Sequence, residues 1–412
     1  MSQGVDRRGY VFVVDKFSYP VHRSRGFCGV KEPKLEWNFS GQSGLYADLL
    51  GTRPGDLVFL YQRRIDESPE DRGFRGVYEI TSRPFVDTQT ISWNGHTVRG
   101  ECPECGSTYP EDWGRDPNKG PWTCDNCDSD VPQGEHIVPN RVLIQPDNYY
   151  PNSVTDNTAY VDQTDPGFIW TKIFRKMYGV GTERSAAPLL PEETEKLLRL
   201  LERENEGTSE VPDFEPYPAQ ENRDYLSPKL GDGPEVPYEH WLHAWILNNI
   251  DEEIPVLSDI VGPLSELEWF GNEIVYGIGR SKVDLLLLHE RDGHRYKATV
   301  GELKQEEITV DNINQIDRYS YWISQLATAN AEPPVEDLQL HPVIIGSGIE
   351  PDARTKLGSM EERQLEIPYS RADSRTTSRT DCTVQIQTPT AVEYTVSDGS
   401  IRFEYISGQS SL

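Results

Sequence analysis

Lys282-Val283-Asp284-Leu285-Leu286-Leu287-Leu288 and, further along, Val300-Gly301-Glu302-Leu303-Lys304 are the stretches that decide the fold. Val283–Leu288 is typical of a buried strand because it is a leucine-rich run that is polar only at its start. Arg291-Asp292-Gly293-His294 is a turn sequence, and Tyr296–Lys304 reads as the return strand of an antiparallel hairpin. Since side chains alternate along a strand, Glu302 and Lys304 share one face.

The length of the turn decides which residue lies opposite Asp284. A two-residue loop would pair Asp284 with Gly301 and leave its side chain on the wrong face. A three-residue loop, Asp292-Gly293-His294, would set Asp284 directly opposite Glu302, with their Cβ atoms about 5 Å apart. Two carboxylates at that separation can share a divalent cation. We therefore expect an odd-length loop with Gly293 at positive φ, or an equivalent bulge.

These residue types suit metal-assisted cleavage of phosphodiesters. Asp284 and Glu302 offer carboxylate oxygens to Mg²⁺ or Mn²⁺, and such an ion polarises a phosphate and activates a water molecule. Lys304 would orient that water or stabilise the developing charge. The alternative is a solvent-exposed ion pair between Glu302 and Lys304, which is the commoner meaning of an isolated Glu-x-Lys.

Two helices are expected around the hairpin. The one that follows it has Asp311 as a cap, and Gln315 and Tyr319 lie four residues apart on one face. The alternative for this segment is an ordinary amphipathic helix. The one that precedes the hairpin spans Pro237–Ile250 and would bring Glu239 towards the metal, or would simply place an acid at the helix N-terminus. His240 and His243, in the same helix, read as surface or packing residues.

Residues 237–350 resemble the PD-(D/E)xK nuclease superfamily, in its branch with a Gln-x-x-x-Tyr helix. They are similar to archaeal endonucleases that act on mismatched or branched DNA. The family's Gly-Arg-x-Asp is here Gly279-Arg280-Ser281-Lys282-Val283-Asp284, with two additional residues after the arginine. The resemblance implies a restriction-endonuclease-like α/β domain with a mixed sheet and Mg²⁺-dependent cleavage. The catalytic residues that it implies are Glu239, Asp284, Glu302, Lys304, Gln315 and Tyr319, with Mg²⁺ held by Asp284 and Glu302.

Cys102-Pro-Glu-Cys105 and Cys124-Asp-Asn-Cys127 are two knuckles joined by the segment 106–123. This spacing can place four thiolates tetrahedrally around one structural Zn²⁺. The zinc would staple an insertion at about residues 96–136 that has too little core of its own; the alternative is a ribbon that grips nucleic acid. A four-thiolate site has no open coordination position for catalysis. Cys28 and Cys382 read as buried thiols.

Residues 8–95 alternate short apolar runs with turn residues, which indicates a small β-rich domain. Gly55-Asp56-Leu57-Val58-Phe59-Leu60-Tyr61, followed by Gly73-Phe74-Arg75-Gly76-Val77-Tyr78-Glu79-Ile80 and Pro84, is similar to the EVE group of PUA-like barrels. That resemblance implies binding of a modified or flipped base in an aromatic pocket. Candidates for stacking on the base are Trp37, Phe39, Tyr61 and Trp93; the alternative is that these aromatics form the barrel core.

The sequence as a whole predicts a multidomain α+β protein. Residues 1–205 form the PUA-like module with its zinc insertion, residues 206–236 a linker rich in Glu, Pro, Gly and Asn, and residues 237–412 the nuclease domain. A helix is expected over Ile169–Tyr178 and another over Pro191–Asn205. No family was assigned to the stretch 350–412.

The net charge of −28, with 12 Lys against 28 Arg, is typical of a protein adapted to molar salt; the alternative is an acidic protein-binding surface. No run of 18 apolar residues is present and the N-terminus lacks a signal peptide, so we expect a cytoplasmic protein with no membrane contact.

The predicted function is a Mg²⁺-dependent DNA endonuclease in modification-dependent restriction. The alternatives are a mismatch or flap repair endonuclease and a non-catalytic nucleic-acid-binding protein. Double-strand cutting often needs two active sites, which favours a homodimer, although no motif identifies one.

Overall fold

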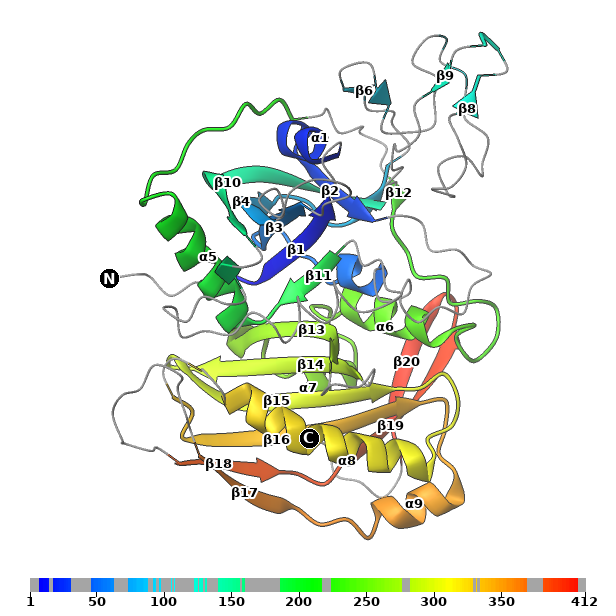
Figure 1. Ribbon diagram of the computed structural model, residues 1–412. Coiled ribbons are helices and arrows are strands. Elements are labelled where there is room, and N and C mark those ends of the chain that lie inside the picture. The colour runs from blue at the N-terminus through cyan, green and yellow to red at the C-terminus, as the bar shows by residue number, and fades with distance from the viewer. Residues whose placement is uncertain are drawn as a thin grey trace.

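The computed structural model describes most of the chain. The described residues are 7–14, 18–30, 46–62, 73–87, 92–93, 96–97, 105, 107, 122–124, 126–128, 130–131, 140–155, 158–159, 186–216, 224–275, 282–328, 331, 334–368 and 381–406. They form an α+β architecture with two large sheets, one from each half of the chain (Figure 1). None of the described helices is long and apolar enough to cross a membrane.

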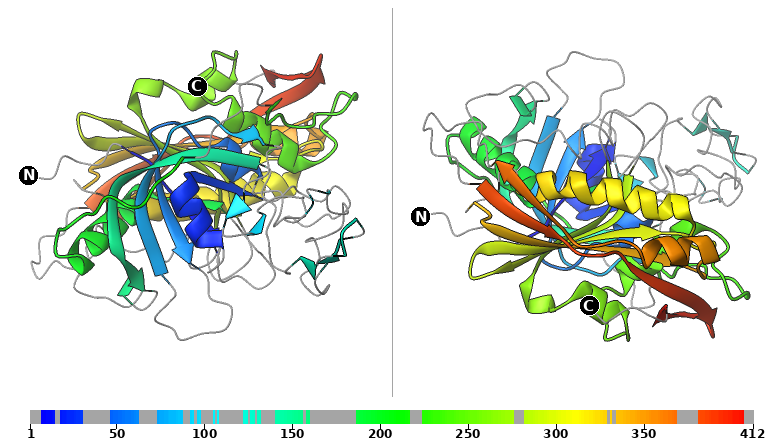
Figure 2. Two further views of the ribbon diagram at one scale, coloured as in Figure 1. Left: turned by 90° about the horizontal axis from the view of Figure 1, so that it is seen from above. Right: turned by 90° about the horizontal axis from the view of Figure 1, so that it is seen from below.

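The N-terminal sheet is curled into a half-barrel (Figures 1 and 2). Its strands are β1 (Gly9–Val14), β2 (Phe27–Val30), β3 (Leu57–Gln62), β4 (Gly73–Ile80), β5 (Phe85–Val86), β10 (Asn140–Thr155), β11 (Ala186–Leu189) and β12 (Asp224–Tyr225). They run in the order β11-β1-β3-β4-β10-β5-β12, and β2 pairs with β10. The β1–β3 pair is parallel and the other pairs are antiparallel. Helices α1 (Ser18–Arg25) and α5 (Pro191–Glu204) pack beside the sheet.

The C-terminal sheet is mixed. Its strands are β13 (Leu267–Val275), β14 (Lys282–Arg291), β15 (His294–Leu303), β16 (Asp337–Gly346), β17 (Arg363–Pro368), β18 (Asp381–Ile386), β19 (Thr390–Ser397) and β20 (Ser400–Tyr405). The order is β13-β14-β15-β16-β18-β17, and β19 pairs with both β16 and β20. Strand β16 is parallel to β15, β18 and β19, whereas the remaining pairs are antiparallel. The C-terminal stretch to which no family was assigned therefore extends the same sheet.

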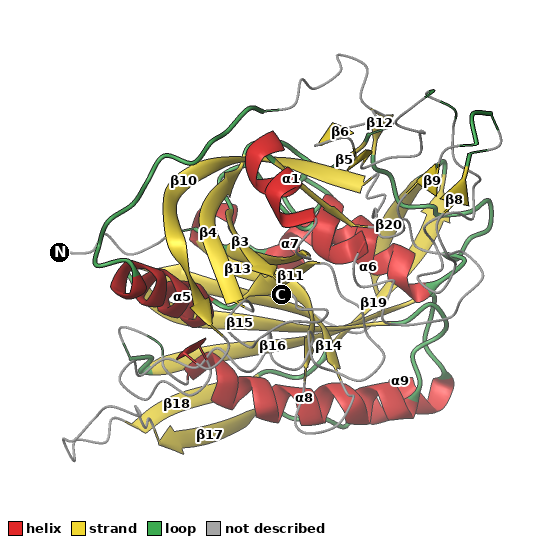
Figure 3. Cartoon of the chain, turned by 45° about the horizontal axis from the view of Figure 1, so that its top comes forward, coloured by secondary structure: helices red, strands yellow, loops and turns green. Residues whose placement is uncertain are grey.

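Helices cover the C-terminal sheet on both faces. They are α6 (Glu239–Asn248), α7 (Leu257–Val261), the 3₁₀ turn η3 (Leu264–Glu266), α8 (Val310–Thr328) and α9 (Pro351–Leu357). Helix α8 lies across one face of the sheet, and α9 continues beside its N-terminal end (Figure 3). The side chains of Ile313, Ile316 and Ile323 of α8 are fully buried. Helix α6 lies between the two sheets (Figure 1).

The predicted helix starts agree with the structure in one case and differ from it in two. Helix α5 begins at Pro191 as predicted, whereas α6 begins at Glu239, two residues after Pro237. The prediction that Asp311 caps α8 is wrong, because Asp311 is already inside the first turn. The cap is a reciprocal pair: the backbone N–H of Thr309 donates to Oδ1 of Asn312 (2.8 Å), and the N–H of Asn312 donates to Oγ1 of Thr309 (3.4 Å). The helix expected over Ile169–Tyr178 lies outside the described residues.

The two halves share one continuous hydrophobic core. One cluster of buried side chains includes Tyr10 and Val58 from the N-terminal sheet, Leu242 from α6, and Val343 from β16. Across the same boundary the indole N–H of Trp269 donates to the carbonyl of Leu189 (2.6 Å). Burying apolar surface is the main source of stability, so each half stabilises the other through this shared core.

Arg53 joins the two halves through hydrogen bonds and an ion pair. Its Nη2 donates to the carbonyls of Leu247 (2.8 Å) and Asn248 (3.3 Å), at the C-terminal end of α6, and lies 2.9 Å from the carboxylate of Asp251. Arg83 also pairs with Asp251. A guanidinium at the C-terminus of a helix meets both its unpaired carbonyls and the negative end of its dipole. The N-terminal module thereby holds α6 in place.

The segment expected to be a linker, 206–236, is packed where it is described. The N–H of Glu210 donates to the carbonyl of Tyr149 (2.8 Å), and the N–H of Glu215 donates to that of Ser24 (2.8 Å). Strand β12 pairs with β5, and Leu230 and Val236 are buried in the shared core. The described residues of this segment therefore pack against both halves, through hydrogen bonds and through apolar side chains in the shared core.

Gly301 allows β14 and β15 to approach at the centre of the C-terminal sheet. A Cβ at Gly301 would lie 2.9 Å from Cβ of Leu285, its cross-strand partner, and neither atom can move without moving a strand. We expect Gly301→Ala to lower the free energy of unfolding by about 1–3 kcal/mol because the added methyl overpacks the sheet.

The matched control is Gly233→Ala, where the nearest atom to an added Cβ is 3.9 Å away. That change should alter stability by no more than about 0.5 kcal/mol. Denaturant titration of both variants in one buffer makes the comparison. Equal stability of the two would show that the strand contact at Gly301 is not tight.

Candidate catalytic site

The β14–β15 hairpin sets Asp284 opposite Glu302. The turn has two residues, Asp292 and Gly293, with φ of 53° and 79°. A register shift after His289 adds one residue to β15, so that the pairs from His289 to Leu285 follow the register of an odd-length loop. Continued by one residue from Leu285–Gly301, this register places Asp284 across from Glu302. The prediction of positive φ at Gly293 with an equivalent bulge is confirmed.

Lys304 contacts three carboxylates at once. Its Nζ lies 2.7 Å from Oε1 of Glu302, 3.4 Å from Oε2 of Glu239 and 3.8 Å from Oδ2 of Asp284. Burial alone would lower the pKa of Lys304, but Asp284, Glu302 and Glu239 outweigh it and raise the pKa above its usual value. The amine is therefore a fixed positive charge at the centre of the cluster.

Glu302 is fully buried and Asp284 nearly so. Burial, together with the nearby charge of Asp284, raises the pKa of Glu302 to about 9, and burial raises that of Asp284 as well. Oδ2 of Asp284 accepts a hydrogen bond from the N–H of Leu303 (2.8 Å). Neither carboxylate oxygen of Glu302 accepts a well-directed hydrogen bond within the described part of the chain. Lys304 compensates this buried pair of acids only in part, and a further cation would stabilise it.

Helix α6 adds Glu239 and His243 to the cluster, one turn apart on the same face. Nε2 of His243 lies 3.9 Å from Oε1 of Glu239 and 4.0 Å from Oδ1 of Asp284. One ligand atom from each of Glu239, His243 and Asp284 falls within 4.8 Å of the others. Carboxylate oxygens with one imidazole suit Mg²⁺ or Mn²⁺, so the residues present fit a divalent cation.

His243, predicted to be a surface or packing residue, is buried and lies beside the acids Glu239 and Asp284. The signal was its i, i+4 spacing from Glu239, which puts both on one helix face. His240, by contrast, does pack: its ring stacks on Tyr238 with centroids 5.5 Å apart, and burial lowers its pKa to about 4.

Gln315 and Tyr319 project together from α8. Nε2 of Gln315 donates to the hydroxyl of Tyr319 (2.9 Å), whose side chain is buried. The predicted i, i+4 pair is therefore formed. Helix α8 contacts β15, the strand that carries Glu302, so the pair and the acids belong to packed neighbouring elements.

Of the predicted stacking residues, only Tyr61 has a described side chain. It is buried and packs against Phe74 with ring centroids 4.8 Å apart, so it belongs to the core of the N-terminal module. Trp37 and Phe39 lie outside the described residues, as does the side chain of Trp93.

A different aromatic cluster joins α1, β4 and β10. The hydroxyls of Tyr19 and Tyr149 lie 3.2 Å apart, and the rings of Tyr78 and Tyr149 pack edge to face. Both Arg23 and Arg75 lie over the ring of Tyr19, at 5.8 and 5.2 Å from its centroid. Within the described residues no ion pair joins either arginine to a carboxylate. No local pattern indicates this cluster, because its members come from three distant segments.

Three of the four predicted zinc ligands are described. Sulfur atoms of Cys105, Cys124 and Cys127 lie within 4.8 Å of one another, and those of Cys105 and Cys124 are 3.5 Å apart. The residues present fit a metal held by thiolates. Cys102 lies outside the described residues. Cys28 and Cys382 are both buried thiols, as expected.

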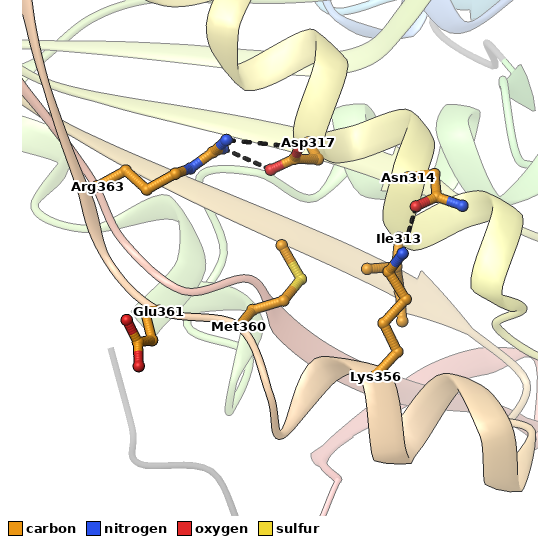
Figure 4. A pocket seen from close by; sticks show the side chains of 7 residues that line it. All are labelled: Ile313, Asn314, Asp317, Lys356, Met360, Glu361 and Arg363. Carbon is orange, nitrogen blue, oxygen red and sulfur yellow. Dashed lines mark hydrogen bonds and ion pairs between the residues drawn. The ribbon is translucent and has the colours of Figure 1, made fainter.

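A cavity of about 270 Å³ lies beside α8, away from the predicted catalytic residues (Figure 4). Two pairs form within its lining, Arg363 with Asp317 and Lys356 with Asn314. None of the acids around Lys304 lines this cavity, so we assign it no part in the candidate site.

No family model matches the sequence, and no curated protein matches it either. Three solved structures show a weak likeness. A Pseudomonas putida protein is 14% identical and covers 47% of this chain and 99% of its own, with a TM-score of 0.25. A hypothetical protein from Leishmania major is 12% identical and covers 49% and 99%, with a TM-score of 0.25. Human THYN1, in complex with DNA containing 5-methylcytosine, is 12% identical and covers 47% and 98%, with a TM-score of 0.25. TM-scores this low assign neither fold nor function to the chain.

The raised pKa of Glu302 predicts how stability varies with pH in the absence of divalent metal. The folded state holds the proton up to a pKa of about 9, whereas the ordinary value is 4.5. Because the folded state then binds more protons than the unfolded chain, the free energy of unfolding falls as the pH rises between these values. In EDTA, Glu302→Gln should lack this part of the decline. Relative to the wild-type chain, the variant should gain up to about 5 kcal/mol in free energy of unfolding between pH 5 and pH 9.

Glu404→Gln is the matched control, because Glu404 is exposed on β20. Denaturant titrations at pH 5 and pH 9 give the comparison, and this variant should follow the wild-type chain. Parallel pH profiles for Glu302→Gln and the wild-type chain would show that Glu302 ionises normally.

Proposed function

We propose that this chain is a divalent-metal-dependent nuclease whose site is formed by Asp284, Glu302, Lys304, Glu239 and His243. The single observation that supports this most strongly is the contact of Lys304 with three carboxylates around the fully buried Glu302. An ordinary surface ion pair does not bury an acid beside a second acid. The resemblance of Asp284 and Glu302-Leu303-Lys304 to PD-(D/E)xK nucleases points to the same chemistry.

Each side chain has a role that follows from its position. Asp284 and Glu302 would hold Mg²⁺ or Mn²⁺, with Glu239 and His243 completing the set from α6. When bound, the cation supplies polarisation of the scissile phosphate and a lowered pKa for an attacking water. Lys304, which keeps its proton, donates hydrogen bonds to the oxygens on which negative charge develops. Gln315 and Tyr319 orient the substrate or the catalytic groups from α8.

We propose further that the N-terminal module contacts the DNA through Arg23 and Arg75 and the tyrosines beside them. In a chain of net charge −28, two arginines with no carboxylate ion pair among the described residues mark a place suited to a polyanion. Cys102, Cys105, Cys124 and Cys127 would hold structural zinc in the adjoining insertion. Together, a DNA-contacting module and a nuclease site favour modification-dependent restriction. A repair nuclease for mismatches or flaps is the alternative that the same chemistry allows.

Asp284→Asn should reduce DNA cleavage in Mg²⁺ by at least about 10²-fold, because it removes a carboxylate charge from the metal set. DNA affinity measured in Ca²⁺ should stay nearly unchanged. Asp317→Asn serves as the matched control on α8, since Asp317 pairs with Arg363 away from the site. Unchanged cleavage by Asp284→Asn would overturn the assignment of the site.

The substrate is tested by binding and cleavage of methylated, hydroxymethylated, plain, mismatched and flap DNA in KCl and Mg²⁺. Arg23→Gln and Arg75→Gln should each weaken binding and reduce the salt slope of log K by about 1, as expected for a lost phosphate contact. Arg402→Gln, an exposed arginine on β20, should leave the slope as it is. Equal cutting of modified and plain DNA would exclude modification dependence while leaving the nuclease assignment intact.

A further inference from the structure

A second polar cluster lies at the other end of the β14–β15 hairpin from the acids. His289 of β14 pairs with Lys297 of β15, and Thr299 of β15 pairs with His341 of β16. Because strand side chains alternate, Lys297 and Thr299 share a face, and their partners share it with them. Four polar side chains from three adjacent strands therefore meet on the sheet face opposite α8.

Several polar atoms of this cluster are buried with nothing to bond. Among the described residues, Oγ1 of Thr299, Nδ1 of His289 and both ring nitrogens of His341 have no hydrogen-bond partner. Thr299 and His289 are themselves fully buried. Since more than nine in ten buried polar groups in folded proteins are satisfied, so many unpaired atoms in one place call for a ligand or ordered solvent.

Lys297 distinguishes between these two explanations. It is only partly exposed, and within the described residues it forms neither a hydrogen bond nor an ion pair. Burial lowers its pKa, with no opposing contribution from an acid. Water can satisfy the unpaired hydrogen-bonding atoms but cannot neutralise the ammonium, whereas an anion neutralises it and accepts from the Thr299 hydroxyl and a ring N–H of His341.

The nearest acids are already engaged elsewhere. Glu266 and Glu268 influence His289, but Glu266 is held by Arg291 and Tyr296, and Glu268 is held by Arg295. Nε2 of His289 lies 2.7 Å from the carbonyl of Val261 and donates to it. A Cβ on Gly262, the next residue, would come within 3.7 Å of Nζ of Lys297. The α7 turn thus closes over the lysine and leaves no room there for a large ligand.

We propose that Lys297, Thr299 and His341 form a binding site for one small tetrahedral oxyanion of the phosphate or sulfate class. The ammonium, the hydroxyl and a ring N–H are three donors from neighbouring strands, which matches the several acceptor oxygens of such an ion. The Thr299 hydroxyl and both ring nitrogens of His341 are buried, so an extended DNA backbone cannot reach them. Lys297 and Glu302 are about 17 Å apart along strand β15, so the site is distinct from the proposed catalytic centre and does not depend on it.

The test is anion binding to the full chain in EDTA at constant ionic strength and neutral pH, with KCl replaced stepwise by potassium phosphate or sulfate. Equilibrium dialysis with labelled phosphate should show one saturable site per chain. At ten times the Kd, the melting temperature should rise by about 1–2 °C. Lys297→Met and the isosteric Thr299→Val should each lose at least about tenfold in anion affinity and most of the melting shift.

Lys229→Met is the matched control because Lys229 is exposed, and it should bind phosphate like the wild-type chain. Thr299→Val retains the lysine and the shape of the site, so it stays informative even where Lys297→Met fails to fold. Absence of saturable binding to the wild-type chain would overturn the proposal in favour of buried water. Unaltered binding by both variants would place the anion elsewhere and overturn it equally.

Discussion

The burial of the Glu302 carboxylate beside Asp284 is the constraint around which the C-terminal half is arranged. Two acids removed from water repel each other, and each loses hydration that the interior must replace. Lys304 replaces part of it through a 2.7 Å contact, and the N–H of Leu303 satisfies one oxygen of Asp284. The bulge in β15 is needed for this geometry, since without it Asp284 would turn to the opposite face. Stability alone gives no reason to keep such an arrangement, whereas the proposed binding of a divalent cation would.

Helix α6, which contributes to the candidate site in the C-terminal half, is positioned by a residue of the N-terminal half. Glu239 and His243 stand on α6, and the far end of α6 is fastened by Arg53 of the N-terminal module through the carbonyls of Leu247 and Asn248. The core that surrounds α6 draws side chains from both sheets. Any shift of the N-terminal module on binding a ligand therefore moves a helix that carries two candidate metal ligands. The described residues of 206–236 are packed and add to this coupling, whereas a linker without contacts would weaken it.

Local sequence was sufficient for elements whose signals are local. The hairpin, α5, α8 and the acidic residues were predictable because alternation, proline at a helix start and the Asp-Gly turn act over a few residues. The place of His243 beside Asp284 was not predicted, because Asp284 approaches it only in the folded chain. Strands β17–β20 were missed because they are specified by pairing with β16 across long separations, and short alternating segments carry little information about their partner. The Arg53 contact is of the same kind, because nothing in the sequence around Arg53 indicates a helix end that belongs to the other half of the chain.

In so acidic a chain, an arginine or lysine without a carboxylate partner among the described residues is more informative than it would be in a neutral protein. The chain has 68 acidic residues against 40 basic ones, and most of the arginines and lysines that the structure describes pair with a carboxylate, as Arg8, Arg141 and Arg295 do. Arg23 and Arg75 contact tyrosine rings instead, and Lys297 lies among histidines and a threonine. Where acids are abundant, keeping them away from a buried or half-buried cation requires selection for something else that is negative. The two positions differ in access: the arginines suit an extended polyanion, whereas Lys297 suits a small enclosed ion. Charge patterning therefore separates the proposed nucleic-acid surface from the proposed anion site within a single chain, on grounds independent of the acidic cluster at Glu302.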